Sequence, residues 1–273
     1  MLKKMLEKIN VGISGANGKM GHALLDNILD SEKHKLCCAF VSQNNFNNEN
    51  LKKYNIQDKI FNNPQVFFNN SNKSQLPAVL IDFSRPYATI NLLQYCILYK
   101  IPMVIGTTGF DANMLEQIHS ASSKIPIVLS ANMSVSVNIL MELVASVTNK
   151  LKNYEVEILE AHHRYKKDAP SGTAIQLGKI VAEERGHNFE DVACFTRHGS
   201  DLVRHRDEIG YSVIRAANEV GMHEVMFLSD TEQISLKTQI TNRNTFAVGA
   251  LMASEFIVNK QNGIFTMLDV INS

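Results

Sequence analysis

The sequence predicts an α/β fold with two domains, and three observations lead to this expectation. Short apolar runs alternate with helical patterns through the first half of the chain, which is typical of βαβ units. A glycine-rich turn follows the first apolar run. Beyond residue 132 the pattern changes to a long helix followed by strand-like runs, which indicates a second, α+β domain.

The first domain is expected to be a parallel sheet covered by helices on both faces. Its strand-like runs are nearly continuous in apolar residues, as in strands that are buried on both sides. An Asn-rich stretch from 42 to about 74 is expected to form surface loops around one or two short elements. The expected strands are 9–14, 35–41, 78–83, 103–105 and 126–130, and the expected helices are 19–29, 88–99 and 112–122.

The second domain is expected to combine helices with strands of an antiparallel type. Its expected elements are a helix over 136–150, a strand over 154–161, a helix over 173–184, and strands over 212–216, 224–228 and 232–241. The tail from residue 246 begins as a helix and is expected to return to the first domain. The predicted domains are therefore 1–133 with 242–273, and 134–241.

Composition and charge argue against several classes of function. Lys plus Arg and Asp plus Glu both number 27, so the balanced charge favours neither nucleic acid nor a membrane surface as partner. No apolar run approaches the ~20 residues of a membrane span, and the first ten residues do not resemble a signal peptide. The four cysteines form no CxxC pair, and they are expected to be buried, reduced thiols in a cytoplasmic protein.

The segment 15–21 follows the first expected strand and opens the first expected helix. Glycines at such a turn let the backbone approach a pyrophosphate, and the helix N-terminus faces its negative charge. Asn17 stands where a strict G-x-G-x-x-G pattern has its middle glycine, and Asn tolerates a positive φ better than most residues. The place of the turn, ahead of a run of βα units, favours a Rossmann-like dinucleotide site over a tight turn that binds nothing.

The end of the second expected strand bears on the choice between NADH and NADPH. A carboxylate ~20 positions beyond the glycine turn usually holds the ribose hydroxyls of NAD, but the sequence here is Ala39-Phe-Val-Ser-Gln43. Lys19 on the turn could meet a 2′-phosphate, although the arginine expected of a strict NADP enzyme is missing from this place. The pattern leans to NADPH with NADH tolerated, and a relaxed pocket with little preference is the open alternative.

Two further loops are expected at the carboxyl ends of strands, where ligands bind in open α/β sheets. They are Gly106-Thr-Thr-Gly109 and Ser130-Ala-Asn-Met133. Small residues with hydroxyl and amide groups suit contact with a nicotinamide ribose and carboxamide. The alternative for the first loop is a simple turn with a helix N-cap.

The stretch from Glu157 to Ala174 places two adjacent histidines and several cations before a Pro-Ser-Gly-Thr turn. His162 and Lys166 can move protons, and the amides of 171–173 at a helix start can bind a carboxylate. This combination predicts chemistry on a small acidic molecule. A solvated loop or a metal site are the alternatives for the histidine pair, but adjacent residues of an extended chain point in different directions, so no metal is expected.

The other charged and ionisable residues lack a specific motif. Arg243 lies where the chain leaves the second domain, and its guanidinium could hold a carboxylate or form a structural ion pair. Arg164 and Lys167 are expected to face solvent. Four further histidines without a partner pattern are expected to be surface or structural residues: His187, His198, His205 and His223.

The motif from Glu157 to Ala174 resembles the substrate-site motif of bacterial dihydrodipicolinate reductases, also called 4-hydroxy-tetrahydrodipicolinate reductases. It reads Glu-Ile-x-Glu-x-His-x-x-x-Lys-x-Asp-x-Pro-Ser-Gly-Thr-Ala, and it is highly specific. The resemblance extends to 15–21, 81–86, 104–110 and 130–138, so that it runs almost end to end. Departures occur at Asn17, Val41-Ser42, Met133 and Ser136.

The resemblance implies the NAD(P)H-dependent reduction of 4-hydroxy-tetrahydrodipicolinate to tetrahydrodipicolinate with loss of water, in the diaminopimelate route to lysine. It implies a Rossmann-like dinucleotide-binding domain and a central α+β domain that binds the small dicarboxylate substrate and forms a homotetramer. His162 would be the proton donor or acceptor and Lys166 a proton donor. Substrate contacts would come from His163, Gly172, Thr173 and Arg243, and cofactor contacts from Gly15, Ala16, Asn17, Gly18, Lys19, Met20, Gly106, Thr107, Thr108, Ser130, Ala131, Asn132 and Met133.

Two rival functions share part of the pattern. A dehydrogenase acting on a sugar or an amino-acid semialdehyde would have the glycine turn but has no need of the Pro-Ser-Gly-Thr loop. A non-catalytic dinucleotide sensor could lose His162 or Lys166 without penalty, yet both residues are present.

Overall fold

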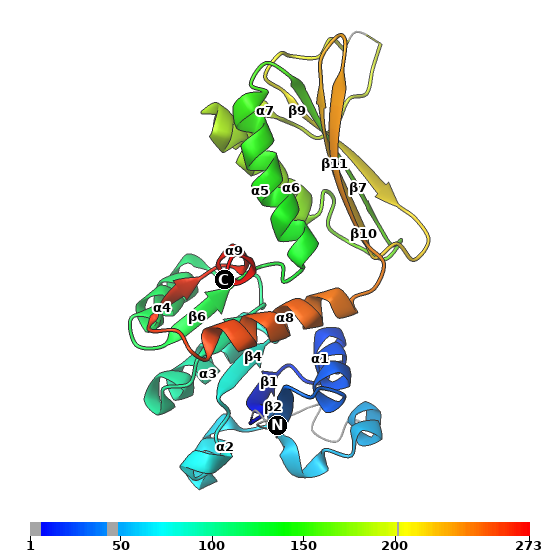
Figure 1. Cartoon of the computed structure of the whole chain (residues 1–273). Helices are drawn as coiled ribbons and strands as arrows, with labels where there is room; N and C mark the ends of the chain where they lie inside the picture. Colours follow the sequence, from blue (N-terminus) through cyan, green and yellow to red (C-terminus); the bar gives the residue numbers. More distant parts are fainter. Residues whose placement is uncertain (1–6, 43–48, 201) are drawn as a thin grey trace, which may run out of the picture. The chain divides into compact units, whose positions relative to one another are not determined.

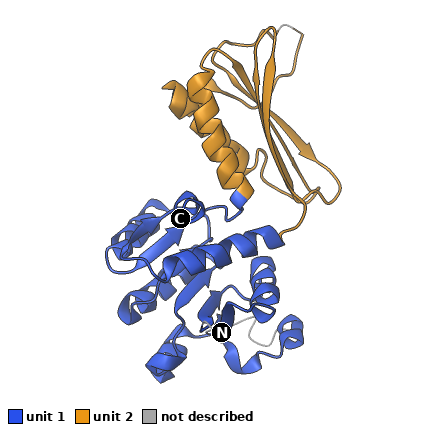
Figure 2. Cartoon of the chain, viewed as in Figure 1, with its two compact units in different colours: residues 1–135, 244–273 blue, residues 136–243 orange. Residues whose placement is uncertain are grey.

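The structure is a computed structural model that describes residues 7–42, 49–200 and 202–273. Residues 1–6, from the segment that is not expected to be a signal peptide, lie outside the described residues. The same holds for residues 43–48 of the Asn-rich stretch. The chain divides into two compact units (Figure 2). Unit 1 comprises Met1–Val135 and Asn244–Ser273, and unit 2 comprises Ser136–Arg243.

Unit 1 contains a seven-stranded sheet in the order β12-β6-β5-β4-β1-β2-β3 (Figure 1). All neighbouring strands in it are parallel. Because β1 lies between β2 and β4, the direction of winding reverses at β1, and ligands bind at such a reversal. The strands are β1 Ile9–Ser14, β2 His34–Phe40, β3 Ile60–Phe61, β4 Val79–Asp82, β5 Met103–Ile105, β6 Pro126–Leu129 and β12 Gly263–Phe265.

Helices cover both faces of this sheet, as the apolar runs predicted. Val79 and Ile81 of β4 belong to one apolar cluster, whereas Leu80 between them belongs to another. Successive side chains of a strand point to opposite faces, so a separate core fills each side of the sheet. The helices of unit 1 are α1 Lys19–Leu29, α2 Pro64–Asn70, α3 Pro86–Tyr99, α4 Ala112–Ser122, α8 Asn244–Ile257 and α9 Met267–Ile271; short 3-10 turns are Glu49–Tyr54, Gln57–Lys59 and Lys73–Gln75.

Unit 2 contains a five-stranded sheet in the order β11-β10-β7-β9-β8. Helices α5 and α6 lie side by side next to this sheet (Figure 1). Their apolar residues, including Val144 of α5 and Leu177 of α6, form a core with Val156 and Ile158 of β7. The strands are β7 Glu155–His162, β8 Ala193–Cys194, β9 Ile209–Arg215, β10 Gly221–Leu228 and β11 Gln233–Ile240, and the helices are α5 Val135–Lys150, α6 Gly172–Arg185 and α7 Phe189–Val192. The expected fold class is thus confirmed: a Rossmann-like α/β sheet with a second α+β sheet.

The expectation of antiparallel strands is wrong for β9. This strand pairs in parallel with β7 and β8, whereas β10 pairs antiparallel with β7 and β11. The chain between β7 and β9 passes through α6 and α7 and so returns to the end at which β7 began. Side-chain periodicity is the same in both directions, so the sequence pattern does not show this parallel pairing.

The cysteines are free, as expected, but they are not all buried. Cys38 and Cys96 lie in the interior, whereas Cys37 and Cys194 are partly exposed, so the prediction of burial is wrong for these two. Cys37 packs at the edge of the cluster that contains Leu80, and its thiol donates to the carbonyl oxygen of Gln75 at 3.0 Å. Within the described ranges, no helix is both long and apolar enough to cross a membrane.

Candidate active site

Two glycines of the turn after β1 are required by its geometry. Gly15 has a φ of +81°, and a Cβ at this position would lie 2.2 Å from the carbonyl oxygen of Phe83. A Cβ on Gly21 in α1 would lie 2.3 Å from the carbonyl oxygen of Gly15. Asn17 does not have a positive φ. The ability of Asn to adopt such a φ, which the sequence suggested for this position, is therefore not needed in the turn. Gly15 makes the turn, and Gly21 lets α1 begin against it.

The amide groups of this turn divide into two sets. Gly15 and Ala16 donate their N–H groups to the carbonyl oxygen of Phe40, at 3.0 and 3.2 Å, and Gly18 donates to Gly15 at 2.9 Å. Helix α1 begins at Lys19, and its N-cap Gly18 supplies no side-chain acceptor for the first turn. The amides able to meet an anion are therefore those that open α1, at Lys19 and Met20, and not those of Gly15 or Ala16.

A cavity of about 660 Å³ lies beside the turn in unit 1. Gly15, Asn17 and Gly18 line it on one side, and Ser42 and Arg85 also contribute to its wall. None of the described residues that line it carries a carboxylate. Arg85 was not predicted to lie here, because it follows β4 and not β2. Its place at the carboxyl end of a strand, in the segment 81–86 that carries part of the resemblance, was the signal for it. These observations fit a dinucleotide, whose phosphates need a helix start and a wall without negative charge.

The loop Gly106–Thr108 is attached to a buried carboxylate. Asp82 is fully buried and accepts hydrogen bonds from Thr107 Oγ1 at 2.7 Å, Thr89 Oγ1 at 2.5 Å and Ser84 Oγ at 2.5 Å. Thr107 is itself buried, so its hydroxyl holds the loop and does not reach outward, whereas Thr108 is exposed. Of the two threonines of this loop, only Thr108 has an exposed side chain.

The loop after β6 is a turn held by its own side chains. Ser130 Oγ donates to the carbonyl oxygen of Asn132 at 2.8 Å, and Asn132 Oδ1 accepts from the Ser134 amide at 2.9 Å. Ala131 is exposed, but Met133 is 1 % exposed and packs in the core of unit 1. Of these four predicted contacts, Met133 can offer main-chain atoms only.

In unit 2, the loop between β7 and α6 carries the predicted acid–base groups. Lys166 Nζ lies 2.9 Å from Asp168 Oδ1, and this hydrogen bond, more than any other contact, holds the pKa of Asp168 below its usual range. The Ala169–Pro170 peptide is cis. Ser171 is the N-cap of α6 and accepts from the Ala174 amide at 3.2 Å. A Cβ on Gly172 would meet nothing within 4 Å, so the backbone at the start of α6 borders open space.

Glu160 is the buried centre of this site. Its Oε1 accepts from Arg215 Nη2 at 2.6 Å and from the Ser171 amide at 3.0 Å. Its Oε2 accepts from Arg215 Nη1 at 2.8 Å and lies 2.5 Å from His162 Nδ1. Burial alone would raise the pKa of this carboxyl, but the hydrogen bonds from His162, Arg215 and Ser171 outweigh it and bring the pKa to about 2. Glu160 is therefore ionised at any pH near neutrality.

Of the four histidines predicted to be surface or structural residues, His223 is the structural one. It is 3 % exposed, its Nε2 lies 3.0 Å from Ser171 Oγ, and its ring centre lies 5.2 Å from that of His162. Burial, followed by the electrostatic effect of the neighbouring His162, lowers its pKa to about 4, and the charge of Lys166 contributes to the same shift. Both predicted proton carriers thus lie close to this ring. The other three histidines of that group are exposed, as predicted: His187, His198 and His205.

The other residues predicted to contact substrate differ in their exposure. His163 and Thr173 are half-buried, and Arg243 is exposed at the carboxyl end of unit 2. The Ser171 amide, expected to bind a substrate carboxylate, is already donated to Glu160. Arg164 and Lys167 are exposed, as predicted. Among the residues that the structure describes, no group of three or more His, Cys, Asp or Glu side chains could hold a metal ion.

A Rossmann-like unit with a glycine turn, followed by a unit carrying acid–base groups at a helix start, defines the class of nicotinamide-dependent oxidoreductases. Family models match both units: "Dihydrodipicolinate reductase, N-terminus" over residues 9–133 and "Dihydrodipicolinate reductase, C-terminus" over residues 136–271. The chain belongs to the dihydrodipicolinate reductase family.

Relatives support this over the full length of the chain. It is 37 % identical to the 4-hydroxy-tetrahydrodipicolinate reductase of Buchnera aphidicola subsp. Cinara cedri, with 98 % of each chain covered. It is 40 % identical to that of Nitrosomonas eutropha, over 96 % of this chain and 98 % of the relative.

Solved structures extend the comparison to the fold. A dipicolinate-bound dihydrodipicolinate reductase from Paenisporosarcina sp. TG-14 matches with a TM-score of 0.77 at 21 % identity, over 97 % of this chain and all of that one. GenD2 from gentamicin A biosynthesis, in complex with NAD, matches with a TM-score of 0.62 at 10 % identity, over 98 % and 91 % of the two chains. At these identities the likeness concerns the fold alone.

Proposed function

We propose that this chain catalyses the NAD(P)H-dependent reduction of 4-hydroxy-tetrahydrodipicolinate to tetrahydrodipicolinate with loss of water, a step of the diaminopimelate route to lysine. The observation that carries this proposal is the grouping of His162, Lys166 and the start of α6 around His223 and Glu160, in a chain of this family. A dicarboxylate substrate fits a helix start beside cationic groups.

In this proposal His162 donates or accepts a proton and Lys166 donates one. His163, Gly172, Thr173 and Arg243 hold the substrate. The open space at Gly172 supports a carboxylate there, because the backbone can be approached without displacing a side chain. The 2.9 Å contact of Lys166 with Asp168 supports its role as an acid, because the carboxylate holds the ammonium group in place on the loop until substrate binds.

The cofactor is proposed to bind unit 1. Main-chain groups at Lys19 and Met20 would hold its phosphates, with Gly15, Ala16, Asn17 and Gly18 shaping the turn. The loops Gly106–Thr108 and Ser130–Met133 would contact the nicotinamide end. When bound, the reduced nicotinamide supplies the hydride; the residues of this chain bind it, orient it and supply the proton.

The proposed preference is for NADPH, with NADH tolerated. Ser42 and Arg85 line the cavity beside the glycine turn, and no carboxylate of its described lining would repel a 2′-phosphate. Replacing Arg85 with alanine is therefore expected to weaken NADPH binding about tenfold, by ~1.4 kcal/mol, and to leave NADH binding within about twofold. Fluorescence titrations with the two cofactors measure this. Equal losses for both would favour the alternative, a relaxed pocket in which Arg85 contacts the part that they share.

The reaction is tested by following NADPH absorbance with freshly generated substrate. The expected result is oxidation of one NADPH for each substrate molecule reduced. Oxidation or reduction of the cofactor with a sugar or an amino-acid semialdehyde, and none with this substrate, would point to the rival dehydrogenase. Cofactor binding without turnover of any of them would point to the dinucleotide sensor.

We further propose that the protein acts in the cytoplasm as a homotetramer assembled through unit 2. On the face of its sheet away from the core with α5 and α6, the exposed Ile214 of β9 lies on the same side as the partly buried Leu159 of β7 and Met226 of β10, and these apolar side chains support an assembly surface there. Sedimentation of the purified protein measures the oligomeric state.

A further inference from the structure

The ionised carboxylate of Glu160 determines which nitrogen of His162 carries the proton. A carboxylate accepts hydrogen bonds and cannot donate them. His162 Nδ1, at 2.5 Å from Oε2, must therefore be the protonated nitrogen of the neutral ring, which leaves Nε2 as the basic nitrogen. A Cβ on Gly221 would lie 3.1 Å from this Nε2, so a glycine in β10 preserves the space beside it.

The same carboxylate connects His162 to the proposed substrate loop. Oε1 accepts the amide of Ser171, the N-cap of α6, and Arg215 spans both oxygens. Arg215 Nη2 also donates to the carbonyl oxygen of Asp168 at 2.7 Å, so the loop is held at two points. The position of the imidazole and the start of the helix therefore depend on one buried group, which is 0 % exposed.

We propose that Glu160 is a positioning residue for the reaction: it holds His162 in the Nδ1-protonated tautomer, with Nε2 directed to the substrate, and keeps this ring in register with the Ser171–Thr173 helix start. Arg215 neutralises the buried charge and orients the carboxylate. This proposal rests on the proposed function for its effect on turnover, but the choice of tautomer depends only on unit 2.

The substitution Glu160→Gln makes a specific prediction about the tautomer. An amide NH₂ group at the place of Oε1 would face two donors, the Ser171 amide and Arg215 Nη2. At the place of Oε2 it faces only one competing donor, Arg215 Nη1, and it can donate to His162 Nδ1. The glutamine is therefore expected to turn its NH₂ group to His162 and to shift the ring to the Nε2-protonated tautomer. An Nε2 that already carries a proton cannot accept one from the reacting groups.

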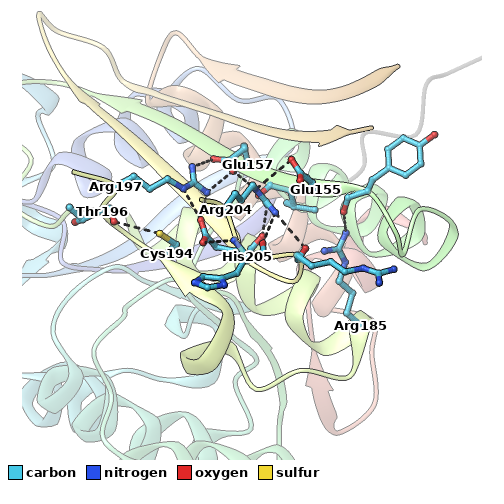
Figure 3. Close-up of polar contacts among 12 residues, drawn as sticks. Glu155, Glu157, Arg185, Cys194, Thr196, Arg197, Arg204 and His205 are labelled. Atoms are coloured by element: carbon cyan, nitrogen blue, oxygen red, sulfur yellow. Dashed lines mark hydrogen bonds and ion pairs between the residues drawn. The ribbon is translucent and has the colours of Figure 1, made fainter. Parts of the chain in front are cut away.

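Glu157→Gln is the matched control. Glu157 is on the same strand β7, three residues away and hence on its opposite face, and it also accepts a bidentate pair, from Arg197 at 2.8 and 3.0 Å (Figure 3). Arg204 Nε donates to it as well, at 3.2 Å. The control thus removes the same charge from an arginine-paired carboxylate of the same strand without touching His162.

The experiment combines steady-state kinetics with solid-state NMR of protein carrying isotope-labelled histidine, in which a His162→Gln variant assigns the His162 signals. In Glu160→Gln, kcat is expected to fall by about a hundredfold, with NADPH affinity and the KM for substrate within about threefold, and the neutral ring is expected to change tautomer. Glu157→Gln is expected to retain both the wild-type kcat and the wild-type tautomer.

The possible outcomes separate this inference from the proposed function. An unchanged tautomer or an unchanged kcat in folded Glu160→Gln would overturn the inference, as would a loss confined to KM. A wild-type protein that does not reduce the substrate would refute the proposed function, and the tautomer comparison would still decide whether Glu160 controls His162.

If Glu160→Gln fails to fold, Arg215→Lys provides the second test. It keeps a cation beside Glu160, so the Nδ1-protonated tautomer and most of kcat are expected to be retained. Loss of the Nδ1-protonated form would overturn the inference.

Discussion

Replacing Lys166 with alanine is expected to lower kcat by about a thousandfold, since a positioned general acid contributes about 10²–10⁴ to a rate. Its ammonium lies at the substrate loop, 2.9 Å from Asp168, and near enough to His223 to affect the pKa of that ring. Removal leaves the reduced substrate without this proton donor, while unit 1, with the proposed cofactor site, is untouched. Steady-state kinetics with NADPH and a titration of cofactor affinity measure both quantities.

The adjacent Lys167 supplies the matched control. It carries the same charge one position further along the loop, is exposed, and has no role in the proposed site. Lys167→Ala is therefore expected to retain kcat, although it removes an equal positive charge from the same loop. If Lys166→Ala turned over substrate at the wild-type rate, Lys166 would not be the proton donor. Equal losses in the two variants would instead indicate a general electrostatic effect of the loop.

Most of unit 1 could be predicted because its pattern is local. Buried parallel strands are continuous apolar runs, and each is followed by a helix with its own periodicity, so β1, α1, β5 and α4 begin and end where the sequence indicated. The elements β3 and α2 lie in the Asn-rich stretch and β8 has only two residues, so no long apolar run marks them in the sequence. The parallel pairing of β9 with β7 was missed because strand direction depends on the path of the connecting chain and not on the strand itself.

The candidate site shows the same division between local and distant information. The motif from 157 to 174 is contiguous, so its histidines, its lysine and its helix start could be read from the sequence. Arg215 and His223 enter the site from β9 and β10, over fifty residues away along the chain, and only the register of the sheet brings them to Glu160 and Ser171. Nothing in their own segments distinguishes them from ordinary surface residues.

The loops of unit 1 add a further reason why residue types alone mislead. Thr107 was expected to offer its hydroxyl to a ligand, but Asp82 takes that hydroxyl inside the protein. Met133 was expected at the same surface, but its side chain fills the core beneath α8. Some polar groups of a short, rigid loop form hydrogen bonds within the protein, and the sequence does not show which of these groups do so. Hydroxyl and amide groups in a loop therefore predict a site better than they predict its contacts.

The buried His223 leads to a second large effect, on stability against pH. Its pKa is about 4 in the folded protein, below the 6.5 of an ordinary histidine, so the unfolded chain binds its proton more readily. The corresponding stabilisation is fully present above about pH 6.5 and decreases as the pH falls toward 4, by about 3 kcal/mol in total. Glu160, with a pKa of about 2 against 4.5, adds a loss in the same direction, but only below about pH 4.5.

His22 and His34, whose pKa values burial also lowers, contribute to the slope between pH 6.5 and 4.5, so the contribution of His223 is the difference between the wild type and a variant that lacks this ring. A His223→Gln variant, which can still form a hydrogen bond with Ser171, is expected to lose about 2 to 3 kcal/mol of the wild-type change in the free energy of unfolding across this interval. Urea denaturation followed by circular dichroism, at one protein concentration and several pH values, measures the difference. His205→Gln is the control, because His205 is exposed and its removal is expected to leave the slope unchanged. Parallel curves for wild type and His223→Gln would mean that this ring does not remain neutral in the folded protein, and that its burial beside His162 is compensated by a charge partner.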